Sequence, residues 1–222
     1  HRDALPHSQM PLCTLPVAVN NEFNGADMFI GPNSYDEGVV AADWANENIG
    51  DGECAIIMGL AGTDVVKNRT NGFTERLEEL GSKIKVVDSQ NADWDRNTAK
   101  DVAATILKTY PDLKIICCNN DVMAMGALEA VKESGKTLNK DVYVIGMDGT
   151  DEAYESIRAN ELSATVSMYP LYESQMATEC AVRILLGQEM PSVIWTPAMV
   201  TDATNVDADE ADTIGWTDPT FE

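Results

Sequence analysis

The amino-acid sequence predicts an α/β fold in which parallel strands form a sheet that helices cover on both faces. Short apolar runs alternate with amphipathic stretches of helical periodicity along most of the 222 residues, and this alternation indicates successive strands and helices. In the block 54–168 the strand segments are apolar on both faces, which is typical of a buried parallel sheet. A composition of 44% hydrophobic and 23% charged residues is that of an ordinary globular protein.

The bounds of each element follow from its apolar pattern and from the residues that interrupt it. Gly50 and Gly52 end the first helix, Gly81 ends the second and Pro111 follows the third, because glycine and proline disfavour continued helix. The strands are expected at 15–20, 54–60, 83–89, 114–118, 142–147, 164–168 and 193–200. The helices are expected at 37–49, 64–80, 96–110, 122–134, 151–159 and 173–186.

The charge balance limits the partners of this chain. The 15 Lys and Arg residues against 37 Asp and Glu residues give a net charge of −22. Nucleic-acid phosphates and anionic membrane surfaces repel a protein this acidic, so no nucleic-acid partner is expected. No apolar run in the sequence approaches the roughly 20 residues that span a bilayer.

Side chains suited to catalysis or metal binding are scarce in this sequence. The only histidines, His1 and His7, lie in an irregular leader, and the five cysteines show no metal-ligand spacing. Cys117 and Cys118 are adjacent in a strand, so we expect their side chains on opposite faces as small buried hydrophobes. We therefore expect no catalytic residue, no metal site and no cofactor.

The loops that follow the expected strands carry planar polar groups. In a parallel α/β sheet, ligands bind beyond the carboxyl ends of the strands. The loops at these ends contain Asn20-Asn21-Glu22-Phe23, Leu60-Ala61-Gly62-Thr63, Gln90-Asn91-Ala92-Asp93-Trp94-Asp95-Arg96, Asn119-Asn120-Asp121, Met147-Asp148-Gly149-Thr150 and Met168-Tyr169-Pro170. Amides and carboxylates hydrogen-bond adjacent hydroxyls, and an aromatic ring covers the apolar face of a sugar. The loops therefore predict binding of a neutral polyhydroxyl ligand rather than catalysis.

Four of these motifs also carry a family resemblance. They are Leu60-Ala61-Gly62-Thr63 with Arg69, the segment 90–96, Asn119-Asn120-Asp121-Val122-Met123-Ala124-Met125-Gly126-Ala127 and Gly146-Met147-Asp148-Gly149-Thr150. With these motifs, residues 15–205 resemble the type I periplasmic sugar-binding proteins of ABC importers, which include the ribose- and allose-binding proteins. The resemblance implies doubly wound parallel sheets in two lobes that close on a sugar.

The resemblance assigns roles to four residues. It implies that Arg69 binds sugar hydroxyls through its guanidinium and that Trp94 stacks on the sugar ring. The alternatives are an ion pair on the helix surface for Arg69 and a place in the core under its loop for Trp94. Asn120 and Asp148 correspond to the hydrogen-bonding pair at the strand ends. Asn120 could instead cap the following helix and Asp148 could fix a turn, and either residue could do both.

Four further positions bear on the choice of ligand. Asn21 falls where ribose-type proteins place a ligand-binding Asp, and Glu22 falls on the neighbouring Arg position. Val65 falls on a position where these proteins have a small apolar residue in the wall of the binding site. Asn21 and Glu22 could also be loop residues that face solvent. Met168 stands where Gln is common at the hinge, and it donates no hydrogen bond. Because Glu22 and Met168 depart from the ribose pattern, we expect another pentose, a hexose or a polyol, with an amine-bearing ligand still open.

The resemblance also implies an N-terminally incomplete copy, since family members have several strand–helix units before the segment that resembles 15–20. The second lobe is expected to be complete and the first lobe truncated, with crossings near Pro32, Met168 and Thr196-Pro197. The expected division is 1–32 as a remnant of the first lobe, 33–168 as the second lobe, 169–196 as a first-lobe helix and strand, and 197–222 as a return crossing and acidic tail.

These features predict an extracytoplasmic solute-binding protein that binds a monosaccharide or polyol and delivers it to an ABC permease. We expect a monomer in the periplasm or a membrane-anchored lipoprotein, its export signal outside this chain, and weak sugar affinity because half of the clamp is missing. The alternatives are a sugar sensor for a chemoreceptor or sensor kinase, the effector domain of a LacI-like regulator, and a sugar-processing enzyme. The regulator would need a basic helix-turn-helix segment, and the enzyme would need a catalytic His or a cluster of metal ligands. The sequence shows neither.

Overall fold

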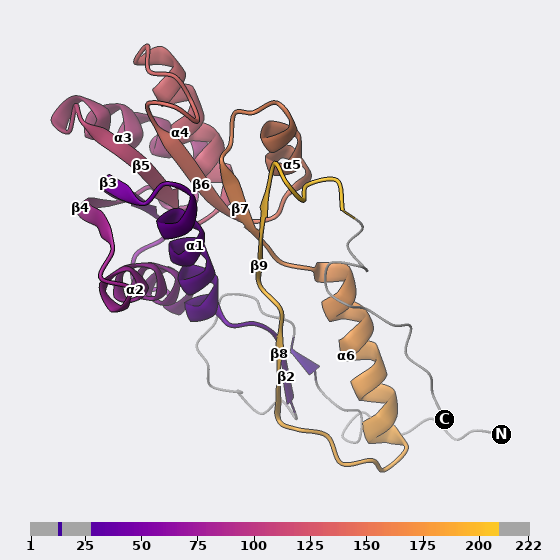
Figure 1. Ribbon diagram of the computed structural model, residues 1–222. Coiled ribbons are helices and arrows are strands. Elements are labelled where there is room, and N and C mark those ends of the chain that lie inside the picture. Colours follow the sequence, from indigo (N-terminus) through magenta and orange to yellow (C-terminus); the bar gives the residue numbers. More distant parts are fainter. Residues whose placement is uncertain (1–12, 15–27, 209–222) are drawn as a thin grey trace.

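The structure is a computed structural model that describes residues 13–14 and 28–208 (Figure 1). One sheet has the order β1 (Cys13–Thr14), β2 (Met28–Pro32), β8 (Val193–Thr196). The other has the order β4 (Lys83–Asn91), β3 (Asp51–Met58), β5 (Leu113–Cys118), β6 (Tyr143–Asp148), β7 (Ala164–Ser167), β9 (Met199–Asp202). Among the described strands every pair except β7–β9 is parallel, so the expected α/β class is confirmed. The expected strand at 15–20 and the residues Asn21 and Glu22 lie outside the described part.

All the expected helices form, with small differences at their ends. They are α1 (Ser34–Asn48), α2 (Asp64–Glu79), α3 (Arg96–Thr109), α4 (Asp121–Glu133), α5 (Asp151–Arg158) and α6 (Pro170–Leu185). Helix α6 begins at Pro170 rather than at Glu173, because proline fits the first turn of a helix, where its missing N–H costs nothing. In the described part of the chain, no helix is both long and apolar enough to cross a bilayer.

The six-stranded sheet is wound in two directions from β3. The chain moves from β3 to β4 on one side and then returns past β3 to β5, β6 and β7 on the other. Right-handed connections in opposite directions place their helices on opposite faces of the sheet. Figure 1 shows this arrangement, with α1 and α2 on one face and α3 and α4 on the other. The sheet is therefore doubly wound, as expected from the sequence.

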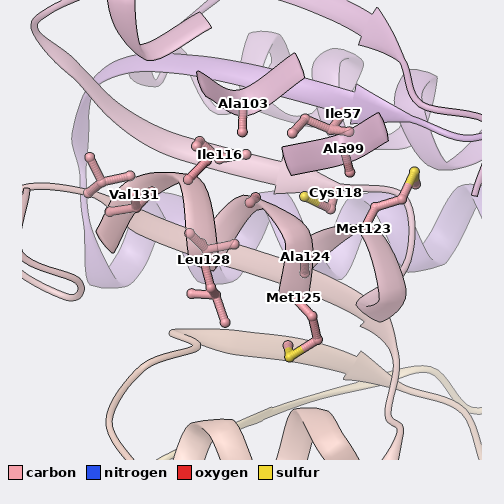
Figure 2. Packing of buried hydrophobic residues seen from close by; sticks show 14 of the residues in the cluster. Ile57, Ala99, Ala103, Ile116, Cys118, Met123, Ala124, Met125, Leu128 and Val131 are labelled. Carbon is pink, nitrogen blue, oxygen red and sulfur yellow. The ribbon is translucent and has the colours of Figure 1, made fainter. Parts of the chain in front are cut away.

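Alternate residues of the central strands enter two separate cores. Ile57 and Cys118 pack with residues of α3 and α4 (Figure 2), whereas Ile56 and Cys117 pack with residues of α1 and α2. The prediction that Cys117 and Cys118 face opposite sides as buried hydrophobes is confirmed. Burial raises the pKa of the Cys117 thiol to about 12, so this thiol stays protonated and unreactive at neutral pH.

The segment 193–200 forms two strands, and the prediction of a single strand is wrong. β8 pairs in parallel with β2, whereas β9 pairs antiparallel with β7 in the other sheet. Pro197 lies between them, and proline lacks the N–H that a continuous ladder needs. The sequence prediction also missed β2, because only three apolar residues precede Gly31 and Pro32.

Candidate functional site

The polar loops meet where the strand order of the six-stranded sheet reverses. β4 lies on one side of β3 and β5 on the other, and ligands of open α/β sheets bind beyond the carboxyl ends of such strands. The Gly59 N–H, after β3, donates to Asn119 Oδ1, after β5, at 3.4 Å. Arg69 of α2 reaches Asp148 at the end of β6, with 3.0 Å between Nη1 and Oδ1. Residues from three strand ends and one helix are thus brought together.

Two glycines allow α1 and α2 to pack with their backbones in contact. A Cβ on Gly38 would overlap the carbonyl oxygen of Arg69, and a Cβ on Gly72 would overlap the carbonyl oxygen of Tyr35. Only a residue without a side chain permits so close an approach. As a consequence Glu37, the neighbour of Gly38, lies directly beside the Arg69 side chain.

Arg69 is buried, with 5% of its surface exposed. Its Nε donates to Glu37 Oε2 at 2.6 Å, and Nη2 donates to Glu37 Oε1 at 3.3 Å. Nη1 donates to the Asn119 carbonyl oxygen at 2.5 Å and contacts Asp148 Oδ1 at 3.0 Å. Nη2 also donates to Met168 Sδ at 3.6 Å, a weak acceptor. This burial excludes the alternative of an ion pair on the helix surface.

Burial and charge together set the protonation of this network. Burial opposes the charge of Arg69, but Glu37 and Asp148 outweigh it and raise the pKa of the guanidinium. Burial raises the pKa of Asp148, and the charge of Glu37 adds to this effect while Arg69 opposes it. The Asp148 side chain is 27% exposed, against 6% for Arg69 and 1% for Glu37. Asp148 Oδ2 has no hydrogen-bond partner among the described residues, so it is the acceptor that a ligand can reach.

Asp148 also has a strained backbone. Its φ is 121° and that of Gly149 is 74°, a region in which only glycine is unstrained. The Asp148 carbonyl oxygen accepts the Met168 N–H at 3.2 Å, and the Gly149 N–H donates to Thr165 Oγ1 at 3.3 Å. Asp148 therefore ends β6 with a strained backbone while its side chain binds Arg69, and the alternative that it fixes a turn stays a prediction.

Two adjacent asparagines keep donors unused. Asn120 is the N-cap of α4, and its Oδ1 accepts the Met123 N–H at 2.9 Å. Capping uses only the carbonyl oxygen, and Asn120 Nδ2 has no partner in the described part of the chain. Asn119 is 1% exposed, and its Nδ2 is a buried donor without a partner among the same residues. Buried donors are rarely left unsatisfied, so a ligand or a water molecule is the expected partner.

Trp94 lies on the backbone of Gly59. A Cβ on Gly59 would overlap the indole ring atoms, so only glycine leaves room for the ring. Asp93 and Trp94 have φ values of 52° and 65°, and this left-handed pair turns the chain after β4. The half-buried ring packs against the apolar cluster under α3 and α4. Trp94 thus occupies the core position considered as its alternative, and stacking on a sugar stays a prediction.

Asp121 is a buried carboxylate that the sequence analysis did not assign to the site. Its Oδ2 accepts the Thr150 N–H at 2.8 Å and the Thr150 hydroxyl at 3.1 Å, and its Oδ1 accepts the Thr165 hydroxyl at 2.7 Å. Burial raises the pKa of Asp121 to about 6, against the effect of these bonds. Asp121 joins the start of α4 to the loop after β6 and so fixes Asn120 relative to Asp148.

The other assigned residues lie at the margin of this network. Val65 is half-buried in the first turn of α2, and Met168 is half-buried after β7. Glu173 of α6 is 6% exposed and accepts the Thr196 hydroxyl at 2.9 Å. Burial raises the pKa of Glu173, and the nearby charge of Glu37 adds to this effect. Within the described residues no three His, Cys, Asp or Glu side chains gather where they would hold a metal ion.

Glu37, Asn119 and Glu173, like Asp121, are buried polar residues of this region that were not predicted from the sequence. For Glu37 a signal was present, since it stands beside Gly38 at the start of the apolar run 39–42, where a charged residue is unusual unless it is paired. Asn119 and Asn120 are the same residue type, and in the sequence they differ only in their position relative to the end of the strand. No pattern in the sequence marks Glu173 as buried, because its burial depends on how α6 lies against β8.

Comparisons with known proteins place this geometry in context. A family profile described as periplasmic binding protein domain matches residues 15–189. The ribose import binding protein of Bacillus subtilis (strain 168) is 34% identical over 172 residues, 77% of this chain and 54% of the relative. The D-allose-binding periplasmic protein of Escherichia coli (strain K12) is 41% identical over 146 residues, 65% of this chain and 46% of the relative. The chain therefore spans about half the length of these curated relatives.

A solved structure shows the same fold. It is the crystal structure of an ABC transporter periplasmic solute binding protein from Actinobacillus succinogenes 130z with bound D-allose. The two structures match with a TM-score of 0.80 at 31% sequence identity, over 88% of this chain and 70% of the other.

Proposed function

Because the chain belongs to the periplasmic binding protein domain family, we propose that it is an extracytoplasmic solute-binding protein that delivers a monosaccharide or polyol to an ABC permease. One observation carries this proposal: Asn119 Nδ2, Asn120 Nδ2 and Asp148 Oδ2 lie at one end of the six-stranded sheet and have no hydrogen-bond partner among the residues that the structure describes. A polyhydroxyl ligand suits such a set, since every hydroxyl both donates and accepts. Pentoses, hexoses and polyols are therefore the proposed ligand classes.

In this proposal the ligand lies between two lobes that close around it. Residues 33–168 form the lobe with the described polar groups, and β2, α6 and β8 belong to the other. The chain passes between the two sheets before α1, after β7 and between β8 and β9, and these segments would act as the hinge. Ligand binding then favours the closed form over the open one. The protein binds its ligand without converting it, in the periplasm or anchored to the membrane.

The test is a calorimetric titration of the chain with D-ribose, D-allose and myo-inositol. Asn120→Asp keeps a capping oxygen for α4 but removes the unused Nδ2 donor, so we expect affinity for the bound sugar to fall about tenfold or more. The control is Asn97→Asp, which adds the same charge at an exposed position of α3 and should leave affinity unchanged. Equal affinity of wild type and the Asn120 variant would refute the proposed site.

A further inference from the structure

Asp148 keeps a backbone conformation that its surroundings must hold in place. Its φ of 121° lies in the region that favours glycine, and strain of this kind persists only where the neighbouring structure fixes it. Asp148 is also the residue whose Oδ2 the proposed function assigns to the sugar. The groups that hold the backbone here therefore also decide where this acceptor lies.

One buried carboxylate, that of Asp121, holds the two residues that follow Asp148. The Thr150 N–H donates to Asp121 Oδ2 at 2.8 Å, and the Thr150 hydroxyl donates to the same oxygen at 3.1 Å. The Gly149 N–H donates to Thr165 Oγ1 at 3.3 Å, and the Thr165 hydroxyl donates to Asp121 Oδ1 at 2.7 Å. Two consecutive N–H groups thus lead to Asp121, one directly and one through Thr165.

We infer that Asp121 and Thr165 are positioning residues, which hold Asp148 in its strained conformation for the sugar and do not touch the sugar themselves. Asp121 is 1% exposed and Thr165 is 0% exposed, so a ligand does not reach either side chain. Asp121 directly follows Asn120 at the start of α4, and it thereby fixes both proposed ligand-binding groups relative to each other. The inference rests on the proposed function and identifies the residues on which the geometry of its site depends.

Gly146 gives the Asp121 carboxylate its place against the sheet. A Cβ on Gly146 would overlap Asp121 Oδ1, so the carboxylate lies directly over β6. Gly146 of β6 is paired with Thr165 of β7, and this register brings the Thr165 hydroxyl to the same carboxylate. Three hydrogen bonds replace the water that the buried carboxylate has lost. A shift of residues 148–150 would break these bonds and leave a buried carboxylate short of donors, which is unfavourable.

The first test compares Thr165→Val with Thr165→Ser in the 222-residue chain without ligand. Valine has a similar shape to threonine but no hydroxyl, so the bonds to Gly149 and Asp121 are both lost, whereas serine keeps them. NMR measures the hydrogen exchange of the Gly149 N–H and the chemical shift of the Asp148 carboxyl carbon. In Thr165→Val we expect exchange to be at least about tenfold faster and the Asp148 signal to move, with both restored in Thr165→Ser. An Asp148 signal that stays in place in Thr165→Val would overturn the inference.

Ser163→Ala is the matched control for the loss of a buried hydroxyl. Ser163 stands at the other end of β7 and is 9% exposed, and its hydroxyl accepts the Val144 N–H at 3.0 Å and donates a second hydrogen bond. Urea unfolding should show that this variant is destabilised, while the Gly149 exchange rate and the Asp148 signal keep their wild-type values. If Ser163→Ala changes them as much as Thr165→Val does, general loss of stability is the cause and the positioning role is refuted.

Asp121→Asn takes the place of Thr165→Val if the valine variant does not fold. Asparagine has the shape of aspartate, but an NH2 donor stands where one of the two acceptor oxygens was. It therefore cannot accept hydrogen bonds from Thr150 and Thr165 at the same time. We expect the Thr150 or the Gly149 N–H to exchange at least about tenfold faster than in the wild type. Wild-type exchange rates at both groups would overturn the inference.

A calorimetric titration with D-allose then relates this network to the binding site. Thr165→Val should bind the sugar about tenfold more weakly than the wild type, whereas Thr165→Ser and Ser163→Ala should bind it with wild-type affinity. Wild-type affinity in a folded Thr165→Val variant would contradict the positioning role. If the wild type itself binds none of D-allose, D-ribose and myo-inositol, the proposed function fails, and the exchange measurements still decide whether Asp121 and Thr165 hold Asp148.

Discussion

Gly38 of α1 lies against the backbone carbonyl of Arg69 on α2, with no space for a Cβ between them. This approach sets the spacing of the two helices, and it is the reason that Glu37 Oε2 and Arg69 Nε are 2.6 Å apart. The principal ion pair of the candidate site thus depends on a residue that has no side chain.

Gly38→Ala should therefore destabilise the protein. The added methyl group would push α1 from α2, and overpacking of this kind costs about 1–3 kcal/mol of the free energy of unfolding. Helix propensity alone predicts the opposite sign, a gain of about 1 kcal/mol for Gly→Ala. Urea unfolding measures the difference, and a stabilised variant would contradict the close approach.

Gly126→Ala is the matched control for this substitution. Gly126 of α4 lies equally close to the Arg96 carbonyl oxygen on the other face of the sheet. Replacement of Gly126 should lower the free energy of unfolding by a similar amount. It should leave the rate of hydrogen exchange of the Arg69 Nε–H, measured by NMR, unchanged. Only Gly38→Ala should alter both quantities.

Asp121 should make stability depend on pH. Its pKa is raised from 3.8 to about 6 in the folded chain, so the folded state binds the proton more tightly than the unfolded state. Relative to Asp121→Asn, the wild type should gain stability as pH falls from about 6 to about 4 and lose it as pH rises through 6. The limit is about 3 kcal/mol at 1.36 kcal/mol per pKa unit, and urea unfolding at pH 4 and pH 7 measures it.

Asp51→Asn supplies a control of opposite sign. The hydrogen bond and charge of Lys114 lower the pKa of the exposed Asp51, so its contribution is present above the ordinary pKa and is lost as pH falls. The stability difference between wild type and this variant should shrink on acidification, whereas the difference for Asp121→Asn grows in favour of the wild type. Parallel pH trends for the two variants would contradict the burial effect at Asp121.

Gly59→Ala should displace the indole of Trp94. The new methyl group would overlap the ring, so the side chain must leave its place against the core at a cost of about 1–3 kcal/mol. Fluorine NMR of fluorotryptophan-labelled protein should show a shift of the Trp94 signal, with Trp44 as the unaffected reference. An unmoved Trp94 signal would show that the ring does not lie on Gly59.

Three cysteines of the central strands should be unreactive until the protein unfolds. Cys54, Cys117 and Cys118 are free and buried, and a thiol reagent attacks the exposed thiolate. In a variant with Cys13→Ser and Cys180→Ser, Ellman's reagent should detect no thiol in the native protein and all three in urea. Rapid labelling under native conditions would contradict the burial of the central strands.

The order of strands and helices was predictable because each element has its own apolar periodicity and is ended by residues that interrupt this periodicity, such as glycine or proline. The same pattern placed Cys117 and Cys118 on opposite faces. It failed at 193–200, where the apolar run continues through Pro197 but the chain changes sheets, and at β2, whose run is too short to be distinctive. Both failures concern the segments that connect the two sheets, because strand pairing there depends on residues far apart in the chain.

The candidate site divides in the same way. The sequence by itself determined that Trp94, Asn120 and Asp148 lie at strand ends and that Arg69 lies in the helix after one of them, since the topology of a parallel sheet places those ends together. Only the tertiary structure decided that Glu37 accepts hydrogen bonds from Nε and Nη2 of Arg69 and that Asp148 Oδ2 has no hydrogen-bond partner in the described part of the chain. The reason is physical: a buried charge is satisfied by whichever group the packing brings within hydrogen-bond distance, and two glycines on different helices set that distance here.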